Sequence, residues 1–340
     1  MKTEFIEKSK INRSVYEKAG KILRNGGLLA FPTETVYGLG GNAFDPEASK
    51  KIFMAKGRPS DNPLIVHVAN PVEAEVFAYT NDTYYKLAER FMPGPLTVIL
   101  PKKDIIPDSV TGGLDSVAVR CPSHPVAREM IMSAGVPIAA PSANISGAPS
   151  PTTASHVLHD MNGRIDMIID GGECRIGVES TVIRLEDDGC TVLRPGEIIP
   201  RELASVVGNV YVSEAVKDPM AAGDKPQSPG MKYKHYAPKT PLVLLSGDSE
   251  KIAEYVNSEK RECTVLSYSE DINKYHCKYV LDIGNGNDPA TQMRRIFSLL
   301  RDTENTEQEV IFANLPPVTD EFLALYNRLI RAAGCTVIKL

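Results

Sequence analysis

Two cationic side chains, Lys56 and Arg58, flank a glycine in the run KGRPSDNP. Lysine and arginine form strong charge-assisted hydrogen bonds to phosphate oxygens, and arginine adds a planar fork of donors. The pair therefore suits a polyphosphate. A second interpretation stays open at this point, because cations at the C-terminal end of a helix also stabilise that helix by complementing its dipole.

A lone arginine lies inside the apolar run SVAVRC, residues 116–121. In a strand, Val117 and Val119 would share one face and Arg120 would lie on the other, so its guanidinium needs an anionic partner. That anion is either the carboxylate of a small substrate or a structural aspartate or glutamate. His67, in the run LIVHV, presents a similar choice between a substrate contact and a satisfied core histidine.

Two short polar side chains, Ser142 and Asn144, stand in PSANISG directly after the apolar run PIAA. Small residues at such a point allow backbone amides to approach an anion or a base, although helix caps and turns use the same residues. The chain contains no Walker A sequence, GxSxG elbow, HExxH or kinase signature. What remains is a set of polar residues held in loops.

The elements expected to position these residues alternate between helix and strand over residues 1–212. Apolar periodicity predicts a helix over 15–25, and the Asp45–Pro46 pair predicts a second helix that ends at about Ala55 and places Lys56 at its C-terminal end. This alternation is typical of an α/β sheet, which places ligands directly after its strands. The expected strands are 28–31, 64–68, 96–100, 116–121, 137–140, 167–170, 180–185 and 190–194.

Residues 213–240 interrupt this alternation with four prolines, two glycines and no sustained periodicity, which indicates a linker. The linker is long, and its run SPGMKYKHYAP holds contact-making residues, so we predict that it forms a lid over the site. The alternative is a passive tether whose aromatic residues are anchored on the second domain. Residues 241–340 then return to five strand-like runs with helical stretches at 288–301 and 320–332. We therefore expect a second, smaller α/β domain, which lacks a GxGxxG dinucleotide fingerprint.

Composition sets limits on the class of protein. A length of 340 residues favours two domains, and no stretch approaches the roughly 20 apolar residues of a membrane span. The N-terminus lacks the apolar core of a signal peptide, so a cytoplasmic location is expected. A net charge of −5 is unsuited to coating nucleic acid, and six cysteines without any CxxC argue against a zinc knuckle or a disulfide framework.

Eight motifs in this order resemble the threonylcarbamoyl-AMP synthase family: FPTETVYGLG, KGRP, PLIVHV, PGPLT, VAVRCP, PSANISG, ESTV and LRPGEI. Lys56 with Arg58 and Ser142 with Asn144 match the KxR…SxN pattern of that family. The resemblance implies a twisted open YrdC-like α/β catalytic domain over 1–212, the linker or lid over 213–240, and a smaller Rossmann-like α/β domain over 241–340.

The resemblance also implies an activity. Such an enzyme is a nucleotidyltransferase that makes threonylcarbamoyl-AMP and pyrophosphate from L-threonine, bicarbonate or carbon dioxide, and ATP. Its product serves tRNA modification through separate threonylcarbamoyl transferase proteins, and Mg²⁺ is expected to arrive with ATP. Direct tRNA binding is left open. Two other classes are weighed: an RNA-binding or translation-factor module without ATP turnover, and a carbamoyl transferase.

Site roles follow from the resemblance residue by residue. Lys56 and Arg58 would be catalytic, by neutralising the triphosphate and the departing pyrophosphate. The ATP site would comprise Lys56, Arg58, Asn62, Ser116, Ser142, Asn144, Ser150, Arg194 and Tyr236. The threonine site would comprise Thr35, His67, Arg120, Ser180 and a backbone contact near Ala140.

Overall fold

The computed structural model of the chain describes residues 2–60, 62–217 and 236–340. Most of the predicted lid, residues 218–235, lies outside the described residues, and Glu214–Lys217 at its start forms the short helix α8. The predicted domain limits at 212 and 240 stay predictions. The chain divides into two compact units, which comprise residues 1–146, 150–175 and 179–232, and residues 147–149, 176–178 and 233–340.

The first unit is built on one 11-stranded sheet with the order β1-β8-β2-β3-β7-β4-β6-β5-β9-β10-β11. Its strands are β1 (Glu4–Ile6), β2 (Leu29–Phe31), β3 (Gly38–Asn42), β4 (Ile65–His67), β5 (Leu96–Pro101), β6 (Ser116–Arg120), β7 (Ile138–Ala140), β8 (Met167–Ile169), β9 (Thr181–Glu186), β10 (Gly189–Arg194) and β11 (Asn209–Val212). Its longer helices are α1 (Arg13–Arg24), α2 (Pro46–Lys56), α3 (Asp82–Phe91), α5 (Pro125–Ala134), α6 (Ala154–Met161) and α7 (Pro200–Val207), and α4 (Asp108–Thr111) is a single turn.

The expected α/β architecture is confirmed, with parallel and antiparallel neighbours mixed in the sheet. Strand β3 was not predicted, because its sequence GLGGN lacks the branched and aromatic residues that favour strands. Its glycines are required by packing. A Cβ atom at Gly38 or Gly40 would lie 2.9 Å from the ring of Phe31 on β2.

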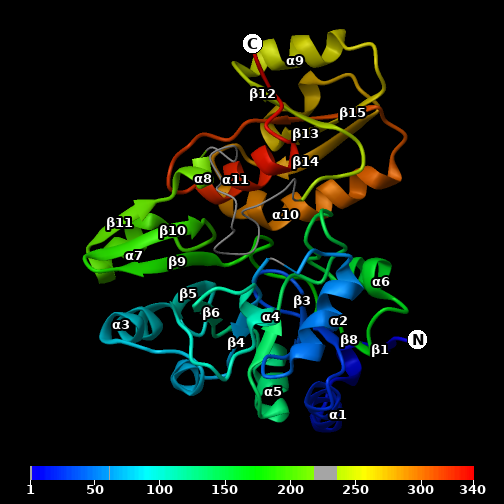
Figure 1. Cartoon of the computed structure of the whole chain (residues 1–340). Coiled ribbons are helices and arrows are strands. Elements are labelled where there is room, and N and C mark those ends of the chain that lie inside the picture. Colours follow the sequence, from blue (N-terminus) through cyan, green and yellow to red (C-terminus); the bar gives the residue numbers. More distant parts are fainter. Residues whose placement is uncertain (1, 61, 218–235) are drawn as a thin grey trace. The chain divides into compact units, whose positions relative to one another are not determined.

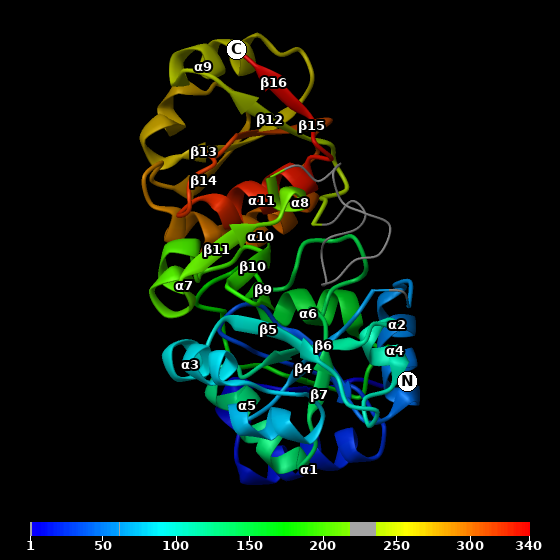
Figure 2. The same cartoon turned by 60° about the vertical axis from the view of Figure 1, so that its left-hand side comes forward.

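The two faces of the sheet carry different cores. Helices α1 and α5 lie side by side over one face, and Phe31, Ile138 and Ile169 pack beneath them (Figures 1 and 2). The larger core on the opposite face includes side chains of α2, α3, α6 and α7. Along β6, Val117 and Val119 belong to that larger core, as predicted, so Ala118 and Arg120 belong to the other face.

Helix α2 brings Lys56 to its place as predicted. The side chain of Asp45 caps its start by accepting a hydrogen bond of 2.9 Å from the backbone N–H of Glu47, and Pro46 occupies the first turn. Gly57 ends the helix with φ of 61°, a left-handed conformation that glycine adopts at little cost. Lys56 is therefore the last helical residue.

The second unit is a smaller α/β unit with a parallel five-stranded sheet in the order β14-β13-β15-β12-β16. Figures 1 and 2 show α9 on one face of this sheet and α10 and α11 on the other. All five expected strands are present. Its elements are β12 (Leu242–Ser246), α9 (Ser249–Ser258), β13 (Cys263–Tyr268), β14 (Tyr279–Gly284), α10 (Pro289–Asp302), β15 (Val310–Asn314), α11 (Leu323–Ala332) and β16 (Val337–Lys339).

None of the helices in the described part of the chain combines the length and the apolar character needed to cross a bilayer. The six cysteines are free thiols, four of them buried.

The close approach of α1 to α5 can be tested at Gly20. Alanine is the better helix former by about 1 kcal/mol, yet a Cβ atom here would lie 2.4 Å from the carbonyl oxygen of Ser133 in α5. We expect Gly20→Ala to lower the unfolding free energy by about 1–3 kcal/mol, measured by chemical denaturation. Lys21→Ala, at the exposed neighbouring residue, should change it by less than about 0.5 kcal/mol. A Gly20→Ala protein as stable as the unsubstituted chain would contradict this packing.

Candidate active site

Arg120 ends the central strand β6 and is buried, with its side chain about 5% exposed. Its Nη2 atom donates to Oε1 of Glu34 at 2.7 Å and to the hydroxyl of Thr35 at 2.9 Å. Its Nε atom is buried and has no hydrogen-bond partner among the described residues. Arg120 therefore keeps a donor available for a further anion.

Glu34 lies in the loop between β2 and β3 and completes a buried ion pair with Arg120. Its second oxygen, Oε2, accepts a hydrogen bond of 3.0 Å from the backbone N–H of Ser123. Burial alone would raise the pKa of the Glu34 carboxyl, but the charge and hydrogen bonds of Arg120 outweigh burial and hold that pKa below its ordinary value. Glu34 is therefore a carboxylate at neutral pH.

His67 ends β4, the parallel neighbour of β6, and is paired with Arg120 in the strand register. Its ring nitrogen Nδ1 lies 3.1 Å from the carbonyl oxygen of Ile65. A carbonyl can only accept, so Nδ1 carries the proton in this contact. Burial, together with the nearby charge of Arg120, lowers the pKa of His67 to about 3. The imidazole is therefore neutral at pH 7.

Ser180 lies in the same region of the sheet as Arg120, on the side of β5. Its hydroxyl lies 2.8 Å from that of Thr97, which is the antiparallel partner of Arg120 on β5. Arg194 donates to Ser180 twice, from Nη2 to the hydroxyl at 3.0 Å and from Nε to the carbonyl at 3.1 Å. Arg194 thus fixes Ser180 in the structure, although the resemblance implies a contact to ATP.

Lys56 is buried, and its ammonium is held by three oxygen atoms. Nζ donates to the carbonyls of Ser142 and Asn144 at 2.5 and 2.6 Å, and lies 3.2 Å from Oδ1 of Asn144. The backbone carbonyl of Lys56 also accepts from Ser146 N–H at 2.9 Å. The end of α2 therefore shapes the PSANISG loop through both backbone and side chain.

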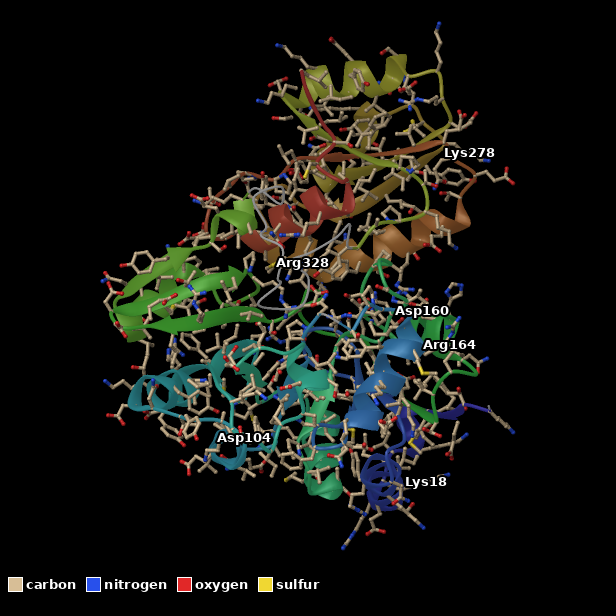
Figure 3. The ribbon with its side chains drawn as sticks, in the orientation of Figure 1. Lys18, Asp104, Asp160, Arg164, Lys278 and Arg328 are labelled. Atoms are coloured by element: carbon tan, nitrogen blue, oxygen red, sulfur yellow. The ribbon has the colours of Figure 1, made fainter. Side chains whose placement is uncertain are left out.

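The PSANISG loop is fixed from two further directions. The hydroxyl of Ser142 donates to Oδ1 of Asn144 at 2.5 Å. Asp160, labelled on α6 in Figure 3, accepts a hydrogen bond of 3.2 Å from the backbone N–H of Ile145 through Oδ2. Lys56, Ser142 and Asn144 are therefore brought together as one cluster, in which a buried positive charge lies beside backbone and hydroxyl groups.

Arg58 and Asn62 belong to the short loop after α2. Nη2 of Arg58 donates to the carbonyls of Asn62 and Pro63, each at 3.3 Å, and its guanidinium lies 5.9 Å from the ring centre of Phe53. Oδ1 of Asn62 is buried without a hydrogen-bond partner in the described residues. The loop thus holds one further polar atom that a ligand could satisfy.

Ser150 and Glu179 form another buried pair, in which the serine hydroxyl donates to Oε1 of the carboxylate at 2.5 Å. Ala140 ends β7 and is paired with Ile65 on β4. Ser116 begins β6, four residues before Arg120 on the same face of the strand. All of these residues belong to the sheet that contains Arg120 or to the loops that connect its strands.

Tyr236 belongs to the second unit. Its ring packs on Phe297 with centroids 5.1 Å apart, and the guanidinium of Arg328, labelled in Figure 3, lies 5.6 Å from its centre. Its φ of 64° is unusual for a residue with a side chain. The implied contact of Tyr236 with ATP stays a prediction.

The polar residues that contact predicted site residues and were missed by the sequence analysis include Glu34, Thr97 and Glu179. Each lies inside a quoted motif, namely FPTETVYGLG, PGPLT and ESTV. The signal that could have found Glu34 was the requirement for an anion near Arg120. The structure shows that this structural acid is present, while Nε of Arg120 keeps no partner among the described residues.

Two family models together match most of the chain. Residues 21–196 match the Sua5/YciO/YrdC model, described as telomere recombination. Residues 198–334 match the model described as the threonylcarbamoyl-AMP synthase C-terminal domain.

Curated relatives and solved structures agree with these matches. The chain is 45% identical to threonylcarbamoyl-AMP synthase of Bacillus subtilis, over 95% of this chain and 94% of the relative. It is 44% identical to the Pyrococcus abyssi enzyme of the same name, over 94% of both chains. The crystal structure of Pyrococcus abyssi Sua5 complexed with L-threonine superposes with a TM-score of 0.92 and 42% identity, and covers 100% of each chain.

The burial of neutral His67 predicts a pH dependence of stability. Its pKa is about 3 in the folded protein and about 6.5 in an unfolded chain, so below pH 6.5 the unfolded state binds a proton that the folded state does not. The unfolding free energy therefore decreases as the pH is lowered. His67 contributes about 2 kcal/mol of that decrease between pH 7 and pH 5. Urea denaturation of His67→Asn should show a loss smaller by that amount. His159→Asn, at a side chain that is 69% exposed, is the control and should keep the full dependence; equal pH dependence in both variants would refute the assignment.

Proposed function

Because this chain belongs to the threonylcarbamoyl-AMP synthase family, we propose that it makes threonylcarbamoyl-AMP and pyrophosphate from L-threonine, bicarbonate or carbon dioxide, and ATP. The product supplies the threonylcarbamoyl group for threonylcarbamoyladenosine in tRNA. The final transfer requires an acceptor adenosine and separate transferase proteins, which are part of the proposal. So is a cytoplasmic location, where tRNA and ATP are both at hand.

The observation that carries the proposal is the state of Arg120. Arg120 is about 4% exposed, its Nη2 atom is paired with Glu34, and its Nε atom has no partner among the described residues, so the guanidinium can take up a second anion. A carboxylate accepts strong, directional hydrogen bonds from arginine. Thr35 accepts a hydrogen bond from Arg120, and His67 is paired with Arg120 in the strand register. The hydroxyl of Ser180 lies beside that of Thr97. This group suits a small polar amino acid such as threonine.

The proposed reaction needs positioning and charge stabilisation rather than a protein nucleophile. The amine of threonine forms a C–N bond to carbon dioxide and loses a proton, which gives a carbamate. A carbamate oxygen then attacks the α-phosphorus of ATP, and the bond from that phosphorus to the bridging oxygen breaks. Pyrophosphate leaves with the electron pair. The described residues would contribute by holding the carboxylate at Arg120 and placing positive charge near the phosphates.

The nucleotide would be held by the cluster of Lys56, Ser142 and Asn144. Nζ of Lys56 contacts three oxygen atoms of the PSANISG loop. These contacts fix both the position of the ammonium and the conformation of the loop. A fixed positive charge in a buried setting stabilises developing negative charge without reorganisation at the moment of reaction. The proposed ATP site of the first unit also includes Arg58, Asn62, Ser116, Ser150 and Arg194.

Magnesium would enter as part of the MgATP substrate. Among the described residues, histidines, cysteines and acids form no group of three or more that could hold a metal ion. The donors around Lys56 are ammonium, hydroxyl and amide groups, which suit phosphate oxygens rather than a cation. Mg²⁺ commonly binds through nucleotide phosphates and water, where it offsets phosphate charge.

Co-substrate dependence is the first test of this function. Pyrophosphate release, followed with a coupled phosphate assay, should require ATP, L-threonine and bicarbonate together, because only the carbamate can attack the α-phosphorus. Omitting threonine or bicarbonate should reduce release to background. Equal release from ATP alone would reject the proposed reaction, and no release with all three substrates would reject the enzyme assignment.

A second test separates the two parts of the site. Arg120→Ala should raise the Kd for threonine at least about ten-fold, because a hydrogen bond between charged groups is lost. Lys56→Ala should lower kcat by about 10²–10³-fold, because fixed charge at the phosphates is lost, while threonine affinity is retained. Lys50→Ala, at an exposed lysine of the same helix that pairs with Glu47, is the control. If Arg120→Ala abolished ATP binding and left threonine affinity unchanged, the two subsites would be assigned in reverse.

A further inference from the structure

We propose that Glu34 is a positioning and specificity residue for the amino-acid site: its carboxylate holds the guanidinium of Arg120 and keeps the site electrically neutral, so that an amino acid bearing both charges is preferred to a bare carboxylate. This inference rests on the proposed function and extends it to a residue outside the predicted site.

The geometry fixes Arg120 from one side only. Glu34 and Thr35 both accept from the same atom, Nη2, at 2.7 and 2.9 Å. Nε takes no partner from the described residues. A guanidinium presents its donors in one rigid plane. Anchoring one terminal nitrogen therefore sets the direction in which the remaining donors point, and Glu34 decides that direction through Arg120.

Glu34 is itself held in place, which is what a positioning residue requires. Its Oε2 accepts the backbone N–H of Ser123, three residues beyond Arg120, at 3.0 Å. Its backbone neighbour Thr35 is fixed through a hydroxyl contact of 2.8 Å to Thr33. Both residues are buried. The Glu34 carboxylate thus links the loop after β2 to the segment after β6. Because it is held by both segments, it stays in place when the guanidinium of Arg120 moves.

The Arg120–Glu34 ion pair itself carries no net charge. Five other titratable side chains that interact electrostatically with Glu34 add no uncompensated charge beside it at pH 7. The pKa values of His67 and His124 are lowered by burial, and burial raises those of Cys121 and Cys174. Arg175 pairs with Glu197 at 2.8 Å.

This neutrality has a consequence for ligand choice. A bare carboxylate would add an uncompensated negative charge beside Glu34 in a region shielded from water, which is unfavourable. A zwitterionic amino acid adds no net charge, and its ammonium offsets the second carboxylate. Neutralising Glu34 would remove this discrimination and release Arg120, whereas a purely structural role would weaken every ligand of the site by the same factor.

The test compares L-threonine with 3-hydroxybutyrate, which is threonine without its amino group, by calorimetry on the full chain. The unsubstituted protein should bind threonine at least ten-fold more tightly than 3-hydroxybutyrate. Glu34→Gln should weaken threonine binding and reduce this preference at least ten-fold. Glu34→Asp, which keeps the charge but withdraws it by one methylene, should weaken threonine binding and keep the preference.

The matched control is Asp166→Asn, because Asp166 also accepts a backbone hydrogen bond, from Leu28 at 2.8 Å, but has no contact with Arg120. It should bind both ligands as the unsubstituted protein does. The proposal is overturned if Glu34→Gln keeps threonine affinity, or if both ligands weaken equally. Should Glu34→Gln fail to fold, unchanged threonine affinity in Glu34→Asp overturns it. Failure of the proposed function would appear separately, as absent threonine-dependent pyrophosphate release in the unsubstituted chain.

Discussion

The interaction on which the first unit depends is the buried ion pair between Arg120 and Glu34. Removing two charges from water costs several kcal/mol each, so such a pair persists only when its geometry and its further hydrogen bonds are satisfied. Thr35 and the backbone of Ser123 supply those bonds. The loop after β2 must therefore reach the end of β6, and β3 and β7 and β4, which lie between β2 and β6 in the sheet, set that separation.

Arg120 and Lys56 differ in the groups that contact their positive charges. At Arg120 the neutralising group is a carboxylate, and Nε has no partner among the described residues. At Lys56 the acceptors include the uncharged oxygens of Ser142 and Asn144, which hold the ammonium at the end of α2. In the proposed function, the ion-paired Arg120 receives the zwitterionic amino acid and the ammonium of Lys56 contributes positive charge near the phosphates. Both groups of residues belong to the first unit, which is built on one 11-stranded sheet.

Sequence reasoning succeeded where a local rule decides the structure. The cap at Asp45 and Pro46 placed the end of α2, and strand alternation placed Arg120 opposite Val119. It failed where the interacting group is distant in the sequence or is a backbone atom, which no residue type reveals. Glu34 lies 86 residues before Arg120, and the oxygens around Lys56 are mostly backbone carbonyls, which any residue possesses. Strand β3 was missed because its glycines are dictated by the ring of Phe31 rather than by strand propensity.

The central claim is that Glu34 aims Arg120 at the carboxylate of threonine. A crystal structure of this chain with L-threonine bound, refined with Arg120 and Glu34 clearly defined, tests it most directly. The account predicts a threonine carboxylate oxygen about 3 Å from Nε of Arg120, with Nη2 still bound to Glu34. A threonine carboxylate held elsewhere, or a guanidinium turned away from Glu34 when threonine binds, would contradict it.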